Sequence, residues 1–150
     1  MAFAIALHLL AAVIWVGGMF FAYLVARPAL STLDTKNRVL TWKASFDRFF
    51  RYVWLAVLTL LLSGYWMVFH VFGGMANIAP YINIMQSLGI LMMLIFMHVY
   101  FAPYKRLKKF VIAGDYEAAS KQVCTIRKLV ALNLTLGILT ILVATVGKYL

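Results

Sequence analysis

The charged residues of this chain are confined to two short segments. Of its 14 Lys and Arg residues, six lie within residues 27–51 and seven within residues 105–128, and all four acidic residues fall in the same two segments. An apolar stretch of about 20 residues spans the hydrocarbon of a bilayer as an α-helix. Four nearly uncharged stretches meet that length, at residues 2–26, 52–72, 82–104 and 129–148. The sequence therefore predicts four transmembrane helices.

The distribution of basic residues also predicts how these helices cross the membrane. Lys and Arg mark cytoplasmic loops, and only Lys148 and the α-amine remain for the other side. We therefore expect both termini outside the cytoplasm. Short connections make sequential helices antiparallel neighbours, so the expected fold is an all-α, four-helix bundle forming one integral membrane domain over residues 1–150.

The net charge and the cysteine count indicate which kinds of partner this chain has. A net charge of +10 in a soluble protein would suggest nucleic acid, but here the segregated charges are better explained as topology determinants that face anionic lipid. Cys124 is the only cysteine, so a disulfide or a thiolate cluster within the chain is excluded. The lipid bilayer is the expected partner, and nucleic acid is not.

Two histidines are expected at a similar depth in the membrane. His8 is 19 residues from Arg27 and His70 is 19 residues from Arg51. At a rise of about 1.5 Å per residue, each imidazole should lie ~28 Å from the cytoplasmic edge, near the outer limit of the hydrocarbon. Because an ionisable residue within a span is a functional-site hypothesis by default, we predict a shared site. The alternative is that each ring is satisfied separately by headgroups and water.

The other basic and imidazole groups fall at two different depths. Lys148 lies 20 residues beyond Lys128 and should reach the outer level as well. His98 lies only seven residues from Lys105, in the inner third of its span. It is therefore a candidate for a second cofactor site, or for an interhelical hydrogen bond to Asn133.

Two facing imidazoles without carboxylates or cysteines suit haem iron or copper better than zinc, calcium or magnesium. The favoured prediction is a haem b with His8 and His70 as axial ligands. Trp15 and Trp66 share the histidine faces of their helices and would line the cofactor, while Lys148 would pair with the propionates.

Copper is the alternative metal. Met67, Met75 and Met85 surround the outer end of the His70 helix, and thioethers are soft ligands suited to Cu(I). Methionine in an apolar span is also ordinary packing material.

Two segments resemble known bacterial membrane proteins. The first stretch reads IALHLLAAVIWVGGMFFAYL from Ile5 to Leu24, and the exit of the third reads MHVYFAPYKRLKKF from Met97 to Phe110. The first stretch resembles the opening helix of CopD-like and HemJ-like proteins. The second resembles the corresponding part of HemJ, where a His-containing helix ends in a basic run. The resemblance implies a multi-pass protein of the bacterial inner membrane that is haem- or copper-associated. HemJ is the membrane protoporphyrinogen oxidase of haem synthesis, and CopD proteins are linked to copper uptake.

The resemblance carries over at few positions. His8 matches the first-helix histidine that is important in HemJ. HemJ also has a functional lysine upstream of the third-helix histidine, where this chain has Gln86 and Ser87. We therefore expect a haem b-binding redox or electron-transfer protein that works with a quinol or a redox partner protein, alone or as part of an oligomer or complex. A HemJ-like oxidoreductase and a copper-binding or copper-transport protein are the alternatives.

Overall fold

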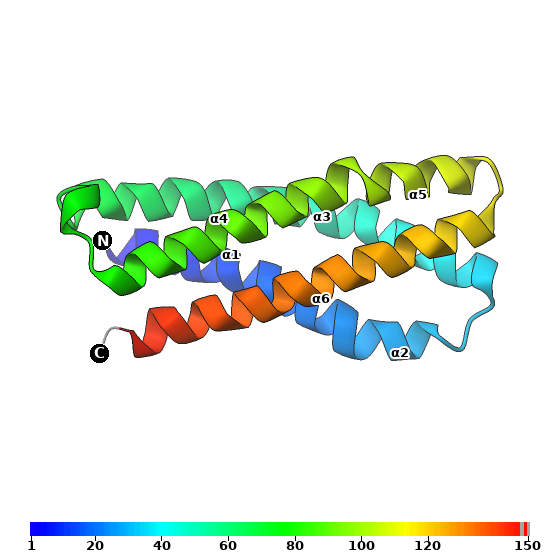
Figure 1. Cartoon of the computed structure of the whole chain (residues 1–150), viewed down its shortest axis with the longest axis horizontal. Helices are drawn as coiled ribbons and strands as arrows, with labels where there is room; N and C mark the ends of the chain where they lie inside the picture. The colour runs from blue at the N-terminus through cyan, green and yellow to red at the C-terminus, as the bar shows by residue number, and fades with distance from the viewer. Residues whose placement is uncertain (148, 150) are drawn as a thin grey trace.

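The computed structural model of the chain describes residues 1–147 and 149. Within these residues it contains helices and no strands, which confirms the all-α prediction, and four long helical rods run along the molecule (Figure 1). The elements, in chain order, are α1 (Ala2–Phe20), η1 (Phe21–Ala26), α2 (Arg27–Leu30), α3 (Thr35–His70), η2 (Met75–Asn77), α4 (Pro80–Phe101), α5 (Pro103–Ile112) and α6 (Tyr116–Val146).

The first rod is continuous through three elements. α1 passes into η1, a π-helical segment, and then into α2 without a break in helical backbone geometry. Pro28 lies at the start of α2, directly after the π-helical segment, and does not interrupt the rod. The rod therefore continues past Arg27, the residue that marks the end of the first apolar stretch.

α3 begins at a side-chain cap and is much longer than a membrane span. The Asp34 carboxylate accepts hydrogen bonds from the Asn37 backbone N–H at 3.2 Å and from Asn37 Nδ2 at 2.5 Å. These bonds hold the pKa of the exposed Asp34 carboxyl below its usual value. The 36 residues of α3 extend for about 54 Å, against about 30 Å of hydrocarbon. Residues 35–51, which belong to the first charged segment of the sequence, are thus part of the helix.

The third and fourth rods are bounded by features visible in the sequence. α4 and α5 are separated at Ala102 (φ −108°, ψ −87°), just before Pro103. The Ala102 backbone is neither α-helical nor in the extended region that proline favours in its preceding residue. Gly114 adopts a positive φ of 74°, and the Asp115 side chain accepts from the Ala118 N–H at 2.9 Å. Gly114 and Asp115, residue types typical of a helix stop and an N-cap, serve in these roles before α6.

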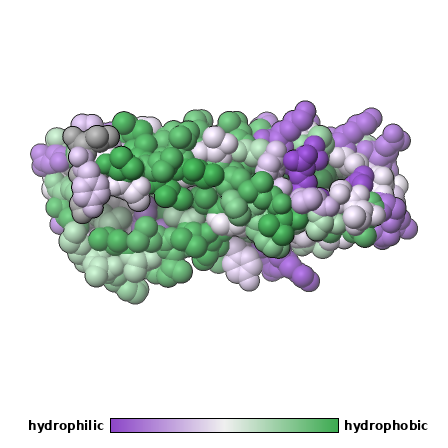
Figure 2. Space-filling view, turned by 90° about the horizontal axis from the view of Figure 1, so that it is seen from below, coloured by the Kyte–Doolittle hydropathy of each residue, from purple (hydrophilic) through white to green (hydrophobic). Residues whose placement is uncertain are grey.

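The rods are antiparallel, and the two ends of the bundle differ in chemistry. α1 packs along α3, and α4 and α5 pack along α6, which also contacts α1 and α3. Both described termini lie at one end with η2, here called the terminal end (Figure 1). The opposite end holds α2, the start of α3 and the α5–α6 connection, and is called the basic end. Figure 2 shows apolar surface over most of the length and hydrophilic side chains gathered at the basic end. That the basic end faces the cytoplasm stays a prediction.

Aromatic packing joins the rods near the basic end. Phe50 of α3 stacks on Phe46 with ring centroids 5.3 Å apart and meets Phe96 and Tyr104 edge-on at 5.6 and 4.8 Å. Edge-to-face pairs of this kind add to the energy of area burial. The Tyr104 hydroxyl also donates to the Asp47 carboxylate. This cluster fixes α3 against α4 and α5.

A close approach of α1 to α3 makes one glycine sensitive to substitution. A Cβ at Gly18 would collide with the ring of Phe49, whereas a Cβ at Gly17 would meet nothing within 4 Å. We expect Gly18→Ala to lower the free energy of unfolding by about 1–3 kcal/mol through overpacking, and Gly17→Ala to be neutral. Thermal unfolding of the two variants in the same detergent, followed by circular dichroism, checks this. Equal melting temperatures would contradict the close packing of α1 on α3.

Candidate functional site

His8 contacts α3 through Ser63. His8 Nδ1 lies 2.9 Å from Ser63 Oγ, which lies 2.5 Å from the Thr59 carbonyl oxygen of its own helix. Because a carbonyl can only accept, the Ser63 hydroxyl donates to Thr59, and His8 Nδ1 donates to Ser63. A Cβ at Gly64 would lie 3.3 Å from His8 Cε1, so the ring rests on the backbone of α3. The neutral ring then carries its lone pair on Nε2.

His70 is the last residue of α3 and its ring is exposed. Its Nδ1 lies 3.2 Å from the carbonyl oxygen of Trp66, and the ring stacks on the Trp66 indole with centroids 5.0 Å apart and an interplanar angle of 10°. Since the carbonyl can only accept, Nδ1 carries the proton and Nε2 keeps its lone pair. Metal-binding histidines commonly show this arrangement, in which the non-ligating nitrogen donates to a carbonyl.

The two imidazoles do not lie at one depth. His8 is level with Ser63, which is seven residues before His70, so the rings are offset by roughly 10 Å along the axis of α3. The equal depth expected from residue counting is therefore wrong. The residue count took Arg27 and Arg51 as markers of one plane at the cytoplasmic edge of the membrane. Both helices continue past these residues, so the two arginines do not mark such a plane. The bis-histidine site itself stays a prediction.

The donors at the terminal end instead follow one stripe of α3. Ser63, Met67 and His70 are spaced i, i+4 and i+7 and so share one helical face. His8 of α1 packs against the inner end of that face at Ser63. The result is a line that passes from an exposed imidazole to a half-buried thioether and then to a half-buried imidazole. We call these three side chains, His70, Met67 and His8, the donor line.

Further soft donors lie at the same end. Met75 is exposed in η2, and Met85 of α4 packs against a small cluster of buried side chains, Val68, Ile78 and Ile82. Within residues 1–147 and 149, no group of three or more His, Cys, Asp or Glu side chains is placed to hold a metal ion. A metal at the terminal end would therefore depend on thioethers beside imidazole. Lys148, expected beside a haem propionate, lies outside the described residues.

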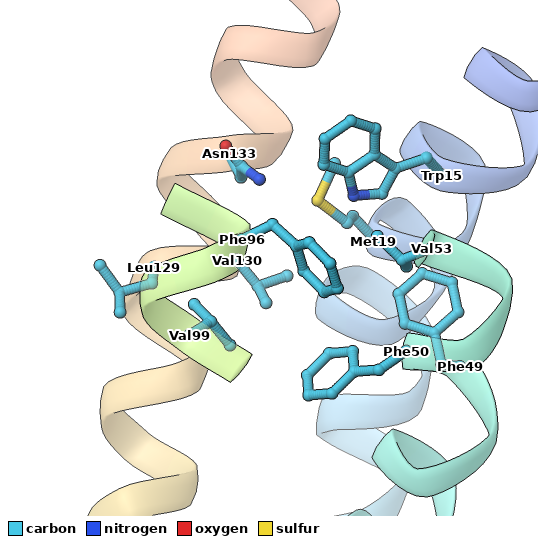
Figure 3. Close-up of a pocket in the computed structure, with 10 residues that line it drawn as sticks. All are labelled: Trp15, Met19, Phe49, Phe50, Val53, Phe96, Val99, Leu129, Val130 and Asn133. Atoms are coloured by element: carbon cyan, nitrogen blue, oxygen red, sulfur yellow. The ribbon is translucent and has the colours of Figure 1, made fainter. Parts of the chain in front are cut away.

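Trp15 belongs to the core. It is 2% exposed and meets Phe96 edge-on, with centroids 6.1 Å apart and an angle of 72°. It lines a cavity of about 20 Å³ between side chains of α1, α3, α4 and α6 (Figure 3). This volume holds about one water molecule. Of the two predicted tryptophans, only Trp66 contacts a histidine of the donor line.

Asn133 also lines this cavity, and its partner differs from the one expected. Its Nδ2 donates to the Met92 carbonyl oxygen at 3.1 Å, and its Oδ1 is buried without a protein partner. His98 is exposed on α4. The predicted His98–Asn133 hydrogen bond is therefore wrong, because an amide within reach of a backbone carbonyl satisfies its donor there. Asn133 is the only Asn in α6, and an isolated polar residue in an apolar sequence is the signal that indicates a buried hydrogen-bonding position.

Comparison with known proteins identifies one family. Residues 43–146 match the family model of copper resistance protein D (CopD), a segment that is more than two thirds of the chain and runs from α3 to the end of α6. The matched segment includes His70, His98 and the three methionines of the terminal end. It does not include His8 or Trp15. No curated protein and no solved structure matches the chain.

The interhelical hydrogen bond of the donor line can be tested without altering a metal donor. Ser63→Ala leaves His8 Nδ1 without its partner, so we expect a loss of roughly 0.5–1.5 kcal/mol in stability. Ser87→Ala is the matched control, because the Ser87 hydroxyl is exposed and bonds only its own helix, at Asn83. Thermal unfolding in detergent measures both. An equal effect of the two substitutions would show that the His8–Ser63 bond adds nothing across the helices.

Proposed function

Because the chain belongs to the copper resistance protein D (CopD) family, we propose that this multi-pass membrane protein binds copper at the terminal end of its bundle and passes it inward. His70 is the observation that carries the proposal. It lies in the matched segment, its ring is exposed, and its Nδ1 proton is committed to the Trp66 carbonyl. The lone pair of Nε2 is thereby ready for an incoming ion.

The donor types favour Cu(I) over harder ions. Imidazole and thioether bind copper well, while calcium and magnesium require several oxygen ligands. Met67 lies three residues from His70, the spacing at which helical side chains are neighbours. Neither donor carries a charge, so a bound Cu(I) would keep its single positive charge and could leave again readily.

The three donors lie at successive depths along the axis of α3, which supports the movement of a copper ion along the bundle. Met67 lies about 4.5 Å inward of His70 along α3, and His8 lies about 10 Å inward. Each step is short enough for an ion to be shared between neighbouring donors before it moves on. Binding sites that are numerous and individually weak favour conduction over storage.

The same offset weighs against the haem b prediction. Two axial ligands must face each other across one iron, whereas His8 and His70 occupy different turns of the α1–α3 seam. The oxidase alternative has no cation where HemJ-like proteins have their lysine, and Gln86 there donates to the Tyr65 hydroxyl at 2.9 Å. Copper accounts for the donor line without these difficulties.

Removing the first donor should weaken copper binding. We expect His70→Ala to reduce Cu(I) affinity by about tenfold or more, the effect of losing one ligand or its support. His98→Ala is the matched control, because it also removes an exposed histidine from the family segment but lies far from the donor line. Affinity is measured on the purified protein in detergent by competition with a chromogenic Cu(I) chelator.

Met67→Leu, which keeps volume and removes the thioether, should give an intermediate loss. If His98→Ala weakens Cu(I) binding as much as His70→Ala, the ion is not bound at the terminal end. If neither substitution has an effect, the donor line is not a copper site.

Metal analysis and an absorbance spectrum of one purified sample distinguish the copper proposal from the haem b prediction. We expect the purified protein, loaded with Cu(I), to retain copper by metal analysis and to show no Soret band. A Soret band that disappears in both His8→Ala and His70→Ala would instead establish the bis-histidine haem b site and overturn the copper proposal.

A further inference from the structure

A larger groove lies at the basic end, away from the donor line. It is bounded by η1 and α2, α3 and α6, and has a volume of about 710 Å³, within the range of about 300–1,000 Å³ that is usual for ligand sites. Three arginines from three different segments line it, Arg27, Arg38 and Arg127. Three permanently charged guanidinium groups therefore line the same groove.

For two of these arginines, the hydrogen-bond acceptors found among the described residues are neutral. Arg38 donates from Nη1 to the Leu33 carbonyl oxygen at 3.1 Å and from Nη2 to Thr35 Oγ1 at 3.4 Å. Arg127 donates from Nη2 to Cys124 Sγ at 3.5 Å. A guanidinium has five N–H donors, so both keep several that these contacts do not use.

Among residues 1–147 and 149, no carboxylate oxygen lies within 4 Å of a guanidinium nitrogen of these three arginines. Arg27 rests on the ring of Tyr23, with its guanidinium carbon 5.1 Å from the centroid. Within the part of the chain that the structure describes, the only ion pair within 4 Å joins Lys43 to Asp47, at 2.7 Å. Asp34 and Asp115 serve as helix caps.

The deeper wall of the groove is apolar. Phe46, Phe49 and Phe50 of α3 and Val130 of α6 line it. Leu24, also in the lining, is exposed on the outer surface of the bundle, so the groove opens toward the region that lipid occupies. It therefore combines a cationic end at the level of the headgroups with an apolar end at the level of the acyl chains.

We propose that this groove binds an anionic phospholipid. The phosphate accepts charge-assisted hydrogen bonds from Arg38, Arg127 and Arg27, which guanidinium groups form well with phosphate oxygens. An acyl chain lies along Phe49 and Val130. Basic hollows between transmembrane helices bind anionic headgroups in this way. The site lies at the opposite end from the donor line and does not depend on the proposed function.

Cys124 supplies a local reporter, because it lines the groove and is the only cysteine. The wild-type chain in detergent is treated with a maleimide in the presence of phosphatidylglycerol or of phosphatidylcholine with the same acyl chains. We expect phosphatidylglycerol to slow labelling by about tenfold, and phosphatidylcholine to slow it little. Equal protection by the two lipids overturns the proposal, since the arginines would then contribute nothing.

Paired variants test the arginines directly. Arg38→Gln/Arg127→Gln removes two charges from the groove, and Arg48→Gln/Arg106→Gln removes two from exposed arginines of the same end that do not line it. The readout is the ratio of labelling rates without and with phosphatidylglycerol, which corrects for any change in intrinsic thiol reactivity. We expect the ratio to fall to the phosphatidylcholine level in the first variant and to stay at wild type in the second.

Two results would overturn the assignment. An equal loss in both double variants would mean that phosphatidylglycerol responds to the overall charge of the basic end. Protection of Cys124 by inorganic phosphate at the same concentration as the lipid would identify a site for free anions. If the groove variant fails to fold by circular dichroism, the wild-type comparison of the two lipids decides by itself.

Discussion

The cost of placing charge in hydrocarbon governs the rest of this structure. A Lys, Arg or Asp at the centre of a membrane helix costs about 3 kcal/mol on insertion scales, and 13 of the 14 basic residues lie in the two segments that meet at the basic end. The apolar parts of the rods can therefore lie in lipid with their backbone hydrogen bonds satisfied and without a charged side chain among them. Any chemistry within the apolar parts of the rods has to use neutral donors, which here are imidazoles, thioethers, hydroxyls and carboxamides.

The rods associate through complementary shapes and a few polar contacts, because the hydrophobic effect does not drive helices together in lipid. Gly18 admits the ring of Phe49, and the cluster around Phe50 joins α3 to α4 and α5. His8–Ser63 and Asn133–Met92 each tie two helices by a hydrogen bond. The first of these bonds has a second consequence, since it fixes the tautomer of His8 and leaves the lone pair on Nε2.

The two ends of the bundle thus suit ligands of opposite charge. Neutral soft donors at the terminal end suit a cation that must be released again. The guanidinium groups of the groove, which have no carboxylate within 4 Å in the described part of the chain, suit an anion with an apolar tail. The segregation of charge to one end also places the two proposed sites at opposite ends of the bundle. A change at the arginine groove is for that reason not expected to alter the ligands of the donor line.

The sequence by itself determined the four helices, the cap at Asp115 with the stop at Gly114, and the gathering of charge at one end, because desolvation and backbone geometry act locally along the chain. It did not determine relative depth. The positions of Arg27 and Arg51 show where the charged segments begin, but they do not show how far each helix continues. The position of His8 beside Ser63 was therefore decided by the packing of α1 on α3. The choice of Met92 over His98 as the partner of Asn133 was likewise a tertiary outcome. Arg27, Arg38 and Arg127 face one groove only because α6 packs beside α1 and α3, a contact between distant segments that no local pattern encodes.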